Sequence, residues 1–270
     1  MSIQANPNNL LIGRGKAYFD RYVNNVPTGN FRFLGNAMKF EITPSTTEKD
    51  RYDMTQKSSP LLATVTTQQD HKFTIDLDEF TKENVALALF GTTSVVTQGT
   101  TPVTSETIFT GLAGTLLPDT VLRLKNRNVP FTGTGALVLT ATGSGSPTAL
   151  VLGTDYEAED SEMGLIHILP TYATVTLAST TLITAAYTPT TGTFNRVAAG
   201  VDTNIHGALI YKGDPVNGPA QEVEVWNLRI KTSGAIALIT DDYGSLPLEG
   251  RVIADTANHP NSPLYQVTYR

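Results

Sequence analysis

Histidines, carboxylates and glycines are the residue types in this chain that could support catalysis or ligand binding. The four histidines, His71, His167, His206 and His259, are scattered, and none lies four residues from another as in a helical zinc site. A histidine without such partners is usually a surface residue or a hydrogen-bonded core residue. We therefore expect no metal site and no cofactor.

The densest acidic segment is residues 155–162, with the sequence DYEAEDSE. Paired carboxylates can act as a general acid and base, but only in a cleft that shifts their pKa values. The segment also lacks the ordered ligand positions and the central glycine of a calcium loop. Because charged runs usually stay exposed, we predict a solvated turn here.

Two short glycine motifs, residues 13–15 and 133–135, are the closest approach to a phosphate-binding loop. Neither completes the dinucleotide fingerprint, and the chain has no Walker-type loop and no G-x-S-x-G nucleophile elbow. The chain has no cysteine, which excludes thiolate catalysis and cysteine-based zinc sites. These observations together predict a protein that is not an enzyme.

The overall charge argues against a protein that grips nucleic acid. The 270 residues carry a formal net charge of -6, whereas affinity for phosphate comes from clustered lysine and arginine. The absence of cysteine fits synthesis in a reducing compartment. No segment resembles a signal peptide or a membrane span, so we expect cytoplasmic synthesis and no membrane partner.

Alternation of apolar and polar residues predicts a mostly β protein. In residues 71–78, Phe73, Ile75 and Leu77 alternate with polar residues and would face a core. By the same pattern and by strand propensity, further strands are predicted at residues 16–23, 31–33 and 222–230.

The apolar phase shifts inside the last of these strands. Glu222–Val225 alternates in one phase, and the apolar set then continues as Trp226, Leu228 and Ile230. A β-bulge near Val225 and Trp226, or burial of both faces, would explain the shift. For the sole tryptophan, we predict burial in the core rather than display as a carbohydrate platform.

One short helix is predicted, over residues 82–90. Thr81 is a good N-cap, and Gly91 is placed to take the left-handed conformation that follows a last helical turn. The helix is rich in apolar residues, so we expect it to pack against a sheet.

Two threonine-rich segments, residues 92–107 and 188–193, predict linkers or extended loops. Between them, short strands are expected at residues 121–125, 136–142, 149–152, 165–169 and 174–177. We predict a discontinuous β domain, residues 1–91 and 194–270, interrupted by an inserted β-rich module, residues 92–193. One continuous β domain with long loops is the alternative.

Residues 43–59 form an unusually polar and charged segment between two strand-like segments. Loops of this length are usually functional or disordered. The alternating charges of residues 48–51 suit pairing with a neighbour that carries both signs. A solvated, flexible excursion is the alternative.

The segment 12–20, IGRGKAYFD, resembles the opening strand of the major tail tube proteins of long-tailed bacteriophages. The resemblance continues, in the same order, through residues 34–37, 40–44, 48–52, 66–71, 80–91, 223–230, 235–239 and 248–252. It covers about residues 10–91 and 200–270 and does not clearly cover residues 108–187.

This resemblance implies a tail-tube-type β-sandwich or barrel with a flanking helix. Six subunits would form a ring whose inner sheets join into a barrel, and the rings would stack into the tube through which DNA leaves the capsid. It also implies assembly in the virion tail after synthesis in the host cytoplasm. The implied partners are further copies of the chain and the tape measure, tail terminator and distal tail proteins.

In such tubes a long loop reaches the adjacent ring, and residues 43–59 match that role. The candidate contact residues are Glu48, Lys49, Asp50, Arg51, Tyr52, Asp53 and Lys57. DNA would pass through the channel without specific binding, since an acidic subunit repeated around it would repel phosphate.

Other classes of protein share the same profile. A capsid decoration protein, a tail completion protein and a secretion-system tube protein are also β-rich and non-enzymatic. A β-sandwich binding module is a further alternative, and it would need an exposed aromatic platform.

Overall fold

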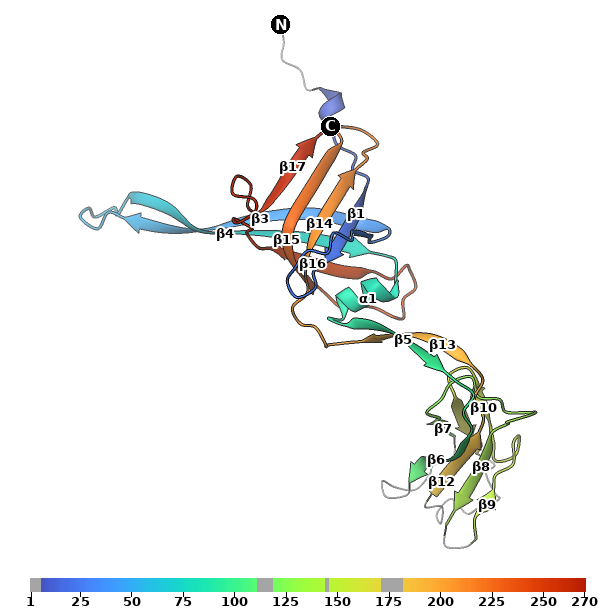
Figure 1. The fold of residues 1–270 in the computed structure, drawn as a ribbon. Coiled ribbons are helices and arrows are strands. Elements are labelled where there is room, and N and C mark those ends of the chain that lie inside the picture. The colour runs from blue at the N-terminus through green and yellow to red at the C-terminus, as the bar shows by residue number, and fades with distance from the viewer. Residues whose placement is uncertain (1–5, 111–118, 144–145, 171–181) are drawn as a thin grey trace. The chain divides into compact units, whose positions relative to one another are not determined.

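The computed structural model describes residues 6–110, 119–143, 146–170 and 182–270 (Figure 1). The described chain is mostly β, as the alternating pattern predicts, with a single α-helix among these residues. Contacts divide the chain into a core unit, residues 1–94 and 196–270, and an inserted unit, residues 95–195. The sequence places the corresponding boundaries at residues 92 and 193.

The core unit is built on one antiparallel sheet with the strand order β2-β1-β14-β15-β16-β4-β3, to which β17 adds by pairing with β15. Its strands are β1 (Gly15–Arg21), β2 (Arg32–Phe33), β3 (Ala37–Tyr52), β4 (Leu61–Leu77), β14 (His206–Gly213), β15 (Gln221–Thr232), β16 (Leu246–Val252) and β17 (Tyr265–Tyr269). A 3-10 helix, η1 (Pro7–Asn9), precedes β1, and the helix α1 (Lys82–Ala88) follows β4.

The long strand β15 changes neighbours along its length. Residues 221–225 pair with β17, and residues 228–232 pair with β16. Where the neighbour of β15 changes, Gly207 of β14 pairs with Leu228 and Leu209 pairs with Val225. A step of two residues along β14 therefore lies opposite a step of three residues along β15. Of the two explanations for the phase shift, the structure confirms the bulge near Val225 and Trp226, and such an extra residue bends its strand.

The sheet packs against itself in two layers. Phe40 of β3 stacks on Tyr211 of β14 with ring centroids 4.4 Å apart, and Phe73 of β4 meets Tyr265 of β17 edge-on at 5.5 Å. Neither pair of strands is adjacent in the sheet, and Figure 1 shows β3 and β4 crossing β14 and β15. The predicted inward residues Phe73, Ile75 and Leu77 are each 2% exposed or less, which confirms their assignment to the core.

Helix α1 begins as predicted and ends differently. The hydroxyl of Thr81 accepts a hydrogen bond from the Asn84 backbone N–H, which is the expected N-cap. The left-handed residue after the helix is Phe90, with φ 53°, so its assignment to Gly91 is wrong. Gly91 instead donates its N–H to the Ala86 carbonyl, closing a Schellman-type end. A Cβ on Gly91 would lie 2.5 Å from the Ala198 carbonyl oxygen, so this position requires glycine for space.

Trp226 is half-buried on the outer face of β15, and its predicted burial in the core is wrong. At the bulge, Val225 faces inward and the indole of Trp226 lies on the other face of the strand. Its ring stacks on His259 at 3.7 Å between centroids, and its Nε1–H donates to the Ser262 carbonyl at 2.8 Å. One face of the indole is thus covered by the loop that precedes β17.

The described residues of the inserted unit form two small antiparallel sheets, with the orders β10-β11-β7 and β6-β12-β8-β9. Its strands are β6 (Val103–Thr110), β7 (Thr120–Arg123), β8 (Val138–Thr142), β9 (Thr148–Ala149), β10 (Tyr156–Asp160), β11 (Leu165–Ile168) and β12 (Leu182–Tyr187). The strands β5 (Thr92–Gln98) and β13 (Gly192–Ala198) pair with each other.

Several predictions for this region need correction. Residues 92–107 are not a loop, because β5 and most of β6 lie there. The low-complexity composition suggested a linker, but threonine and valine favour strands. The acidic segment 155–162 is not a solvated turn, because it contains β10. Its first residue, Asp155, is buried and accepts a hydrogen bond from the Val151 N–H. The strand predicted at residues 174–177 lies outside the described residues.

Removing the inserted unit is expected to leave the core unit folded. The two hydrophobic cores have no residue in common. A chain that lacks residues 99–191, with β5 and β13 joined by a short Gly-Ser linker, should therefore unfold cooperatively in a thermal scan followed by circular dichroism. Insoluble protein, or a scan without a cooperative transition, would show that the core unit depends on the inserted unit.

Candidate assembly interface

Strands β3 and β4 continue beyond the rest of the sheet as a two-stranded ribbon, residues 44–71 (Figure 1). The other neighbour of β4, strand β16, pairs with it only as far as Lys72. Beyond that point β3 and β4 pair only with each other, up to Tyr52 opposite Leu61. A strand rises about 3.3 Å per residue, so the paired part of the ribbon is roughly 25 Å long.

The predicted loop at residues 43–59 is therefore mostly a strand, and only residues 53–60 form a turn. The partner strand, β4, contains the sequence signal for a strand that the prediction did not use. Residues 61–67, LLATVTT, are rich in β-branched residues, which favour strands. The alternation of apolar and polar residues is absent because neither face of the ribbon is buried.

Both faces of the ribbon are exposed. Every residue from Thr43 to Gln69 except Asp53 is exposed, including the apolar residues Met54, at 77%, and Leu62, at 67%. A two-stranded hairpin alone is only marginally stable in water, and contiguous exposed apolar groups often mark interaction sites. The ribbon therefore has the properties of a surface that a partner covers.

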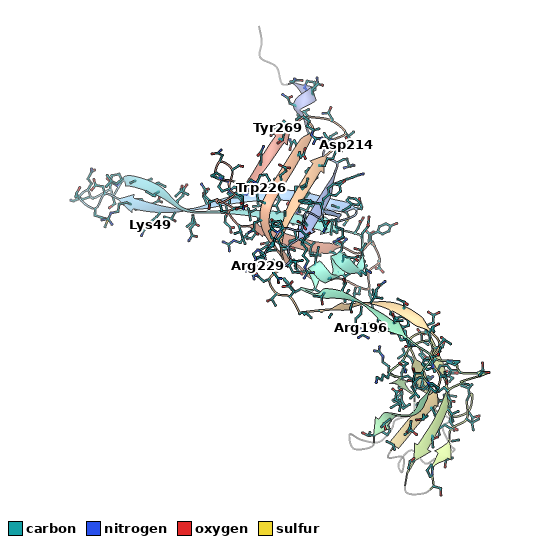
Figure 2. The ribbon with its side chains drawn as sticks, viewed as in Figure 1. Lys49, Arg196, Asp214, Trp226, Arg229 and Tyr269 are labelled. Carbon is teal, nitrogen blue, oxygen red and sulfur yellow. The ribbon has the colours of Figure 1, made fainter. Side chains whose placement is uncertain are left out.

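Acidic and basic side chains of residues 48–51 lie on opposite faces of the ribbon. Side chains alternate between faces along a strand, so Glu48 and Asp50 share one face and Lys49 and Arg51 share the other. The Thr64 hydroxyl donates to Asp50 at 2.8 Å across the acidic face. Figure 2 labels Lys49 on the ribbon, away from the rest of the sheet.

These charges have no ionic partner among the residues that the structure describes. Among the ion pairs of the described residues, none includes Glu48, Lys49, Asp50, Arg51 or Lys57. An acidic face and a basic face that form no ion pair within the described chain can pair with complementary charges on another molecule.

The tip of the ribbon is organised by Asp53. Its carboxylate accepts hydrogen bonds from the Thr55 N–H at 2.9 Å, the Thr55 hydroxyl at 2.6 Å and the Gln56 amide at 3.1 Å. Its own N–H donates to the Pro60 carbonyl and closes the turn. These bonds, with that from the Thr55 hydroxyl first, lower the pKa of Asp53. The exposed Lys57 lies in the same turn.

Replacing Asp53 with alanine is expected to loosen this turn without affecting the core unit. The Thr55 amide should then exchange with solvent faster in a hydrogen-exchange experiment, whereas Asp50→Ala, on the ribbon but outside the turn, should leave that rate unchanged. The pKa of Asp53 is lowered from 3.8, so its contribution is complete above pH 3.8 and is lost as pH falls through the lower folded value. Protection of Thr55 that stays constant after the Asp53 carboxylate has become protonated, as followed by its carboxyl chemical shift, would contradict this role.

The structure brings the sequence-predicted contact residues together. Residues 48–52 occupy the outer half of β3, and Asp53 and Lys57 lie in the turn. Sequence reasoning missed the other strand, which adds the exposed Leu61, Leu62 and Val65 to the same ribbon.

Sequence reasoning also missed a row of cations on the outer face of the sheet. Lys72, Arg251 and Arg229 are direct neighbours across β4, β16 and β15. Arg251 pairs with Asp70 at 2.8 Å. A shallow cavity of about 320 Å³ lies beside this row and is lined by Phe90, Thr203, Arg229, Lys231 and Arg251. These residues are far apart in the sequence, and only the strand register brings them together.

Elsewhere, the histidines are held by hydrogen bonds. His167 lies between Glu157, at 3.1 Å from Nδ1, and Asp119, at 2.7 Å from Nε2, and the bond to Glu157 is the largest cause of its raised pKa. The part of the chain that the structure describes contains no group of three side chains placed to hold a metal ion. Within that part, no helix is long and apolar enough to cross a membrane.

Comparison with known proteins adds a family but not a function. No curated protein matches the chain. Residues 10–266 match the family model described as "Protein of unknown function UCP028589", which spans both segments of the core unit and the inserted unit. The chain therefore belongs to this family of unknown function.

Proposed function

We propose that this protein is a structural virion protein that polymerises, as stacked six-subunit rings, into the tail tube of a long-tailed bacteriophage. The observation that carries the proposal is the ribbon, whose apolar side chains are exposed and whose charged residues 48–51 and Lys57 form no ion pair within the described chain. The order of motifs that resembles the tail tube proteins, from residues 12–20 to residues 248–252, supports the same assignment.

The ribbon suits an axial contact between rings. Its paired part adds roughly 25 Å of reach beyond the sheet, enough to contact another subunit. Its acidic and basic faces would select the partner's orientation, because like charges brought together oppose binding. Residues 48–53 and Lys57 are the proposed contact residues on β3 and the turn.

The open edges of the core unit suit a lateral contact within a ring. In the described chain, β2 and β3 end the main strand order, and β17 pairs on one side only, with β15. Unpaired strand edges invite association with other strands, and closure into a barrel removes them. A ring of core units would provide such closure.

The charge balance suits a conduit for DNA. The net charge of -6 opposes tight binding of phosphate. The cations of the outer face are partly compensated, since Lys72 and Lys231 both lie within 3.5 Å of Glu249. DNA would pass without specific binding, and the tape measure, terminator and distal tail proteins would contact the tube along its bore and at its ends.

The stoichiometry of small assemblies tests this function. In native mass spectrometry of the purified protein, we expect a six-subunit species and larger species that are multiples of six. A six-subunit species that never grows would favour a tail completion protein. A monomer at every concentration, also when preformed assemblies from sheared virions are added as seeds, would contradict the proposal.

A further inference from the structure

The connection between β15 and β16, residues 233–245, displays an unusual apolar tip formed by Leu238, Ile239 and Tyr243. These three side chains are 83%, 97% and 89% exposed. A single exposed apolar residue is normal on a protein surface, but three such residues on one loop mark an interaction site.

The apolar tip stands on an ordered base. The Ser233 N–H donates to the Pro247 carbonyl at 3.1 Å, and Ile236 packs against the core of the core unit. Next to the tip, the Thr240 hydroxyl donates to the Asp242 carbonyl and accepts from the Asp242 N–H. The loop is thus held in a shape that presents the three side chains to solvent.

A complementary apolar groove lies on the same unit. Its volume is about 200 Å³, and its apolar lining includes Leu11, Phe40, Ile42, Tyr211, Pro215 and Pro219. An apolar cavity of about 150 Å³ in another protein takes up benzene. The groove can therefore accept one aromatic ring or branched aliphatic side chain.

The apolar tip and the apolar groove lie at opposite ends of β15. Tyr211 lies near the end of β14 and Pro215 lies in the connection that leads into β15, whereas the tip lies in the connection that follows Thr232, the last residue of β15. The twelve residues of β15 span roughly 35 Å. Figure 2 labels Asp214, next to Pro215, at one end of these strands, and Arg229 lies farther along β15. The tip cannot fill the groove of its own chain.

We propose that the apolar tip of one copy docks into the apolar groove of a second copy. Two complementary features at different places on one subunit make a head-to-tail contact, which closes into a ring or continues as a filament. This inference rests on the proposed function in that it names one contact of the proposed polymer. The contact itself requires only self-association.

Cross-linking tests the contact directly, because the chain has no cysteine of its own. Two single variants, Ile239→Cys in the tip and Leu11→Cys in the groove, are mixed at equal concentration and oxidised. We expect a disulfide between residue 239 of one chain and residue 11 of another, identified by mass spectrometry. The control mixes Ile239→Cys with Val201→Cys, which is 62% exposed and outside the groove, and it should give little product.

A second measurement tests the energetics. The double variant Leu238→Ser, Ile239→Ser should raise the concentration at which the protein associates at least tenfold, since burial of either side chain accounts for about such a factor. Val201→Ser is the matched control and should associate as the wild type does. Circular dichroism of both variants checks that the fold is kept.

The outcomes separate this contact from the proposed function. If the wild-type protein forms tubes but the 239–11 cross-link is absent and the double variant assembles normally, the docking is wrong and the tube proposal stands. If the cross-link forms but the assemblies are not tubes, the docking stands and the tube proposal fails. If neither association nor cross-link occurs, both are overturned. A cross-link from residue 239 to a surface outside the groove also overturns the docking.

Discussion

Shortening the ribbon is expected to abolish polymerisation while the core unit stays folded. The change removes residues 46–69 and joins Ser45 to Asp70 through Asn-Gly. Ser45 and Asp70 are partners in the β3–β4 register, and Asn-Gly favours the two-residue type I′ turn that closes such a pair. The hairpin then ends where its support by the rest of the sheet ends.

The shortened chain should be about as stable as the wild type, because the residues that it lacks are exposed to solvent. All of residues 46–69 except Asp53 are exposed, so the core loses no buried side chain, and Asp70 remains to pair with Arg251. Thermal unfolding should therefore be close to that of the wild type. Sedimentation velocity should show no species above a single ring at concentrations where the wild type forms polymers.

A charge-preserving variant controls for non-specific effects on the ribbon. Lys49→Arg with Arg51→Lys keeps the basic face and should polymerise as the wild type does. Polymers formed by the shortened chain would show that the ribbon does not carry the axial contact. Loss of the folded state on shortening would show that the ribbon supports the core, contrary to its exposure.

Replacing Phe73 with alanine is expected to have the largest effect on stability. The Phe73 side chain is 0% exposed, and its ring lies 5.7 Å from that of Phe40 and 5.5 Å from that of Tyr265, measured between centroids. It therefore fills the space between the two layers of the sheet. Truncation of a buried phenylalanine lowers the free energy of unfolding by about 3–5 kcal/mol, against about 5–15 kcal/mol for a whole domain.

The measurement is denaturant unfolding in the ribbon-shortened background, at a concentration where sedimentation velocity shows only the monomer, so that association does not contribute to stability. Phe31→Ala is the matched control, because Phe31 is 40% exposed, and its effect should stay within about 0.5 kcal/mol. A loss below about 1 kcal/mol for Phe73→Ala would contradict the packing of β3 and β4 against β14 and β17.

The parts of the fold that the sequence predicted are those with one buried face. The inner end of β4 has a clear period of two because Phe73, Ile75 and Leu77 meet the core and their neighbours meet solvent. The bulge in β15 was visible for the same reason, since an extra residue must shift that period. Thr81 was a readable N-cap because capping is a local interaction.

The parts that could not be predicted from the sequence are of two kinds. Some are set by tertiary contacts, and others have no buried face that would leave an apolar pattern. Both faces of the ribbon are exposed, so its strands carry no apolar period, and its polar residues looked like a loop. Gly91 is required by the close approach of the Ala198 backbone and not by a left-handed conformation, which Phe90 takes instead, and sequence alone does not show that approach.

The candidate site divides in the same way. Glu48 to Asp53 could be selected from the sequence because they are consecutive and their charges alternate. The cationic row could not, because Lys72, Arg229 and Arg251 meet only through the register of three strands. The exposure of the apolar tip at residues 238–243 could not be predicted, because an apolar segment in a sequence normally indicates a buried strand.

Self-assembly into tubes is the central claim, and negative-stain electron microscopy of the purified protein over a concentration series tests it most directly. We expect hollow tubes or stacked rings for the wild type, and single rings or monomers for the ribbon-shortened chain on the same grids. Separate, uniform particles for both proteins at every concentration, with preformed assemblies added as seeds, would contradict it.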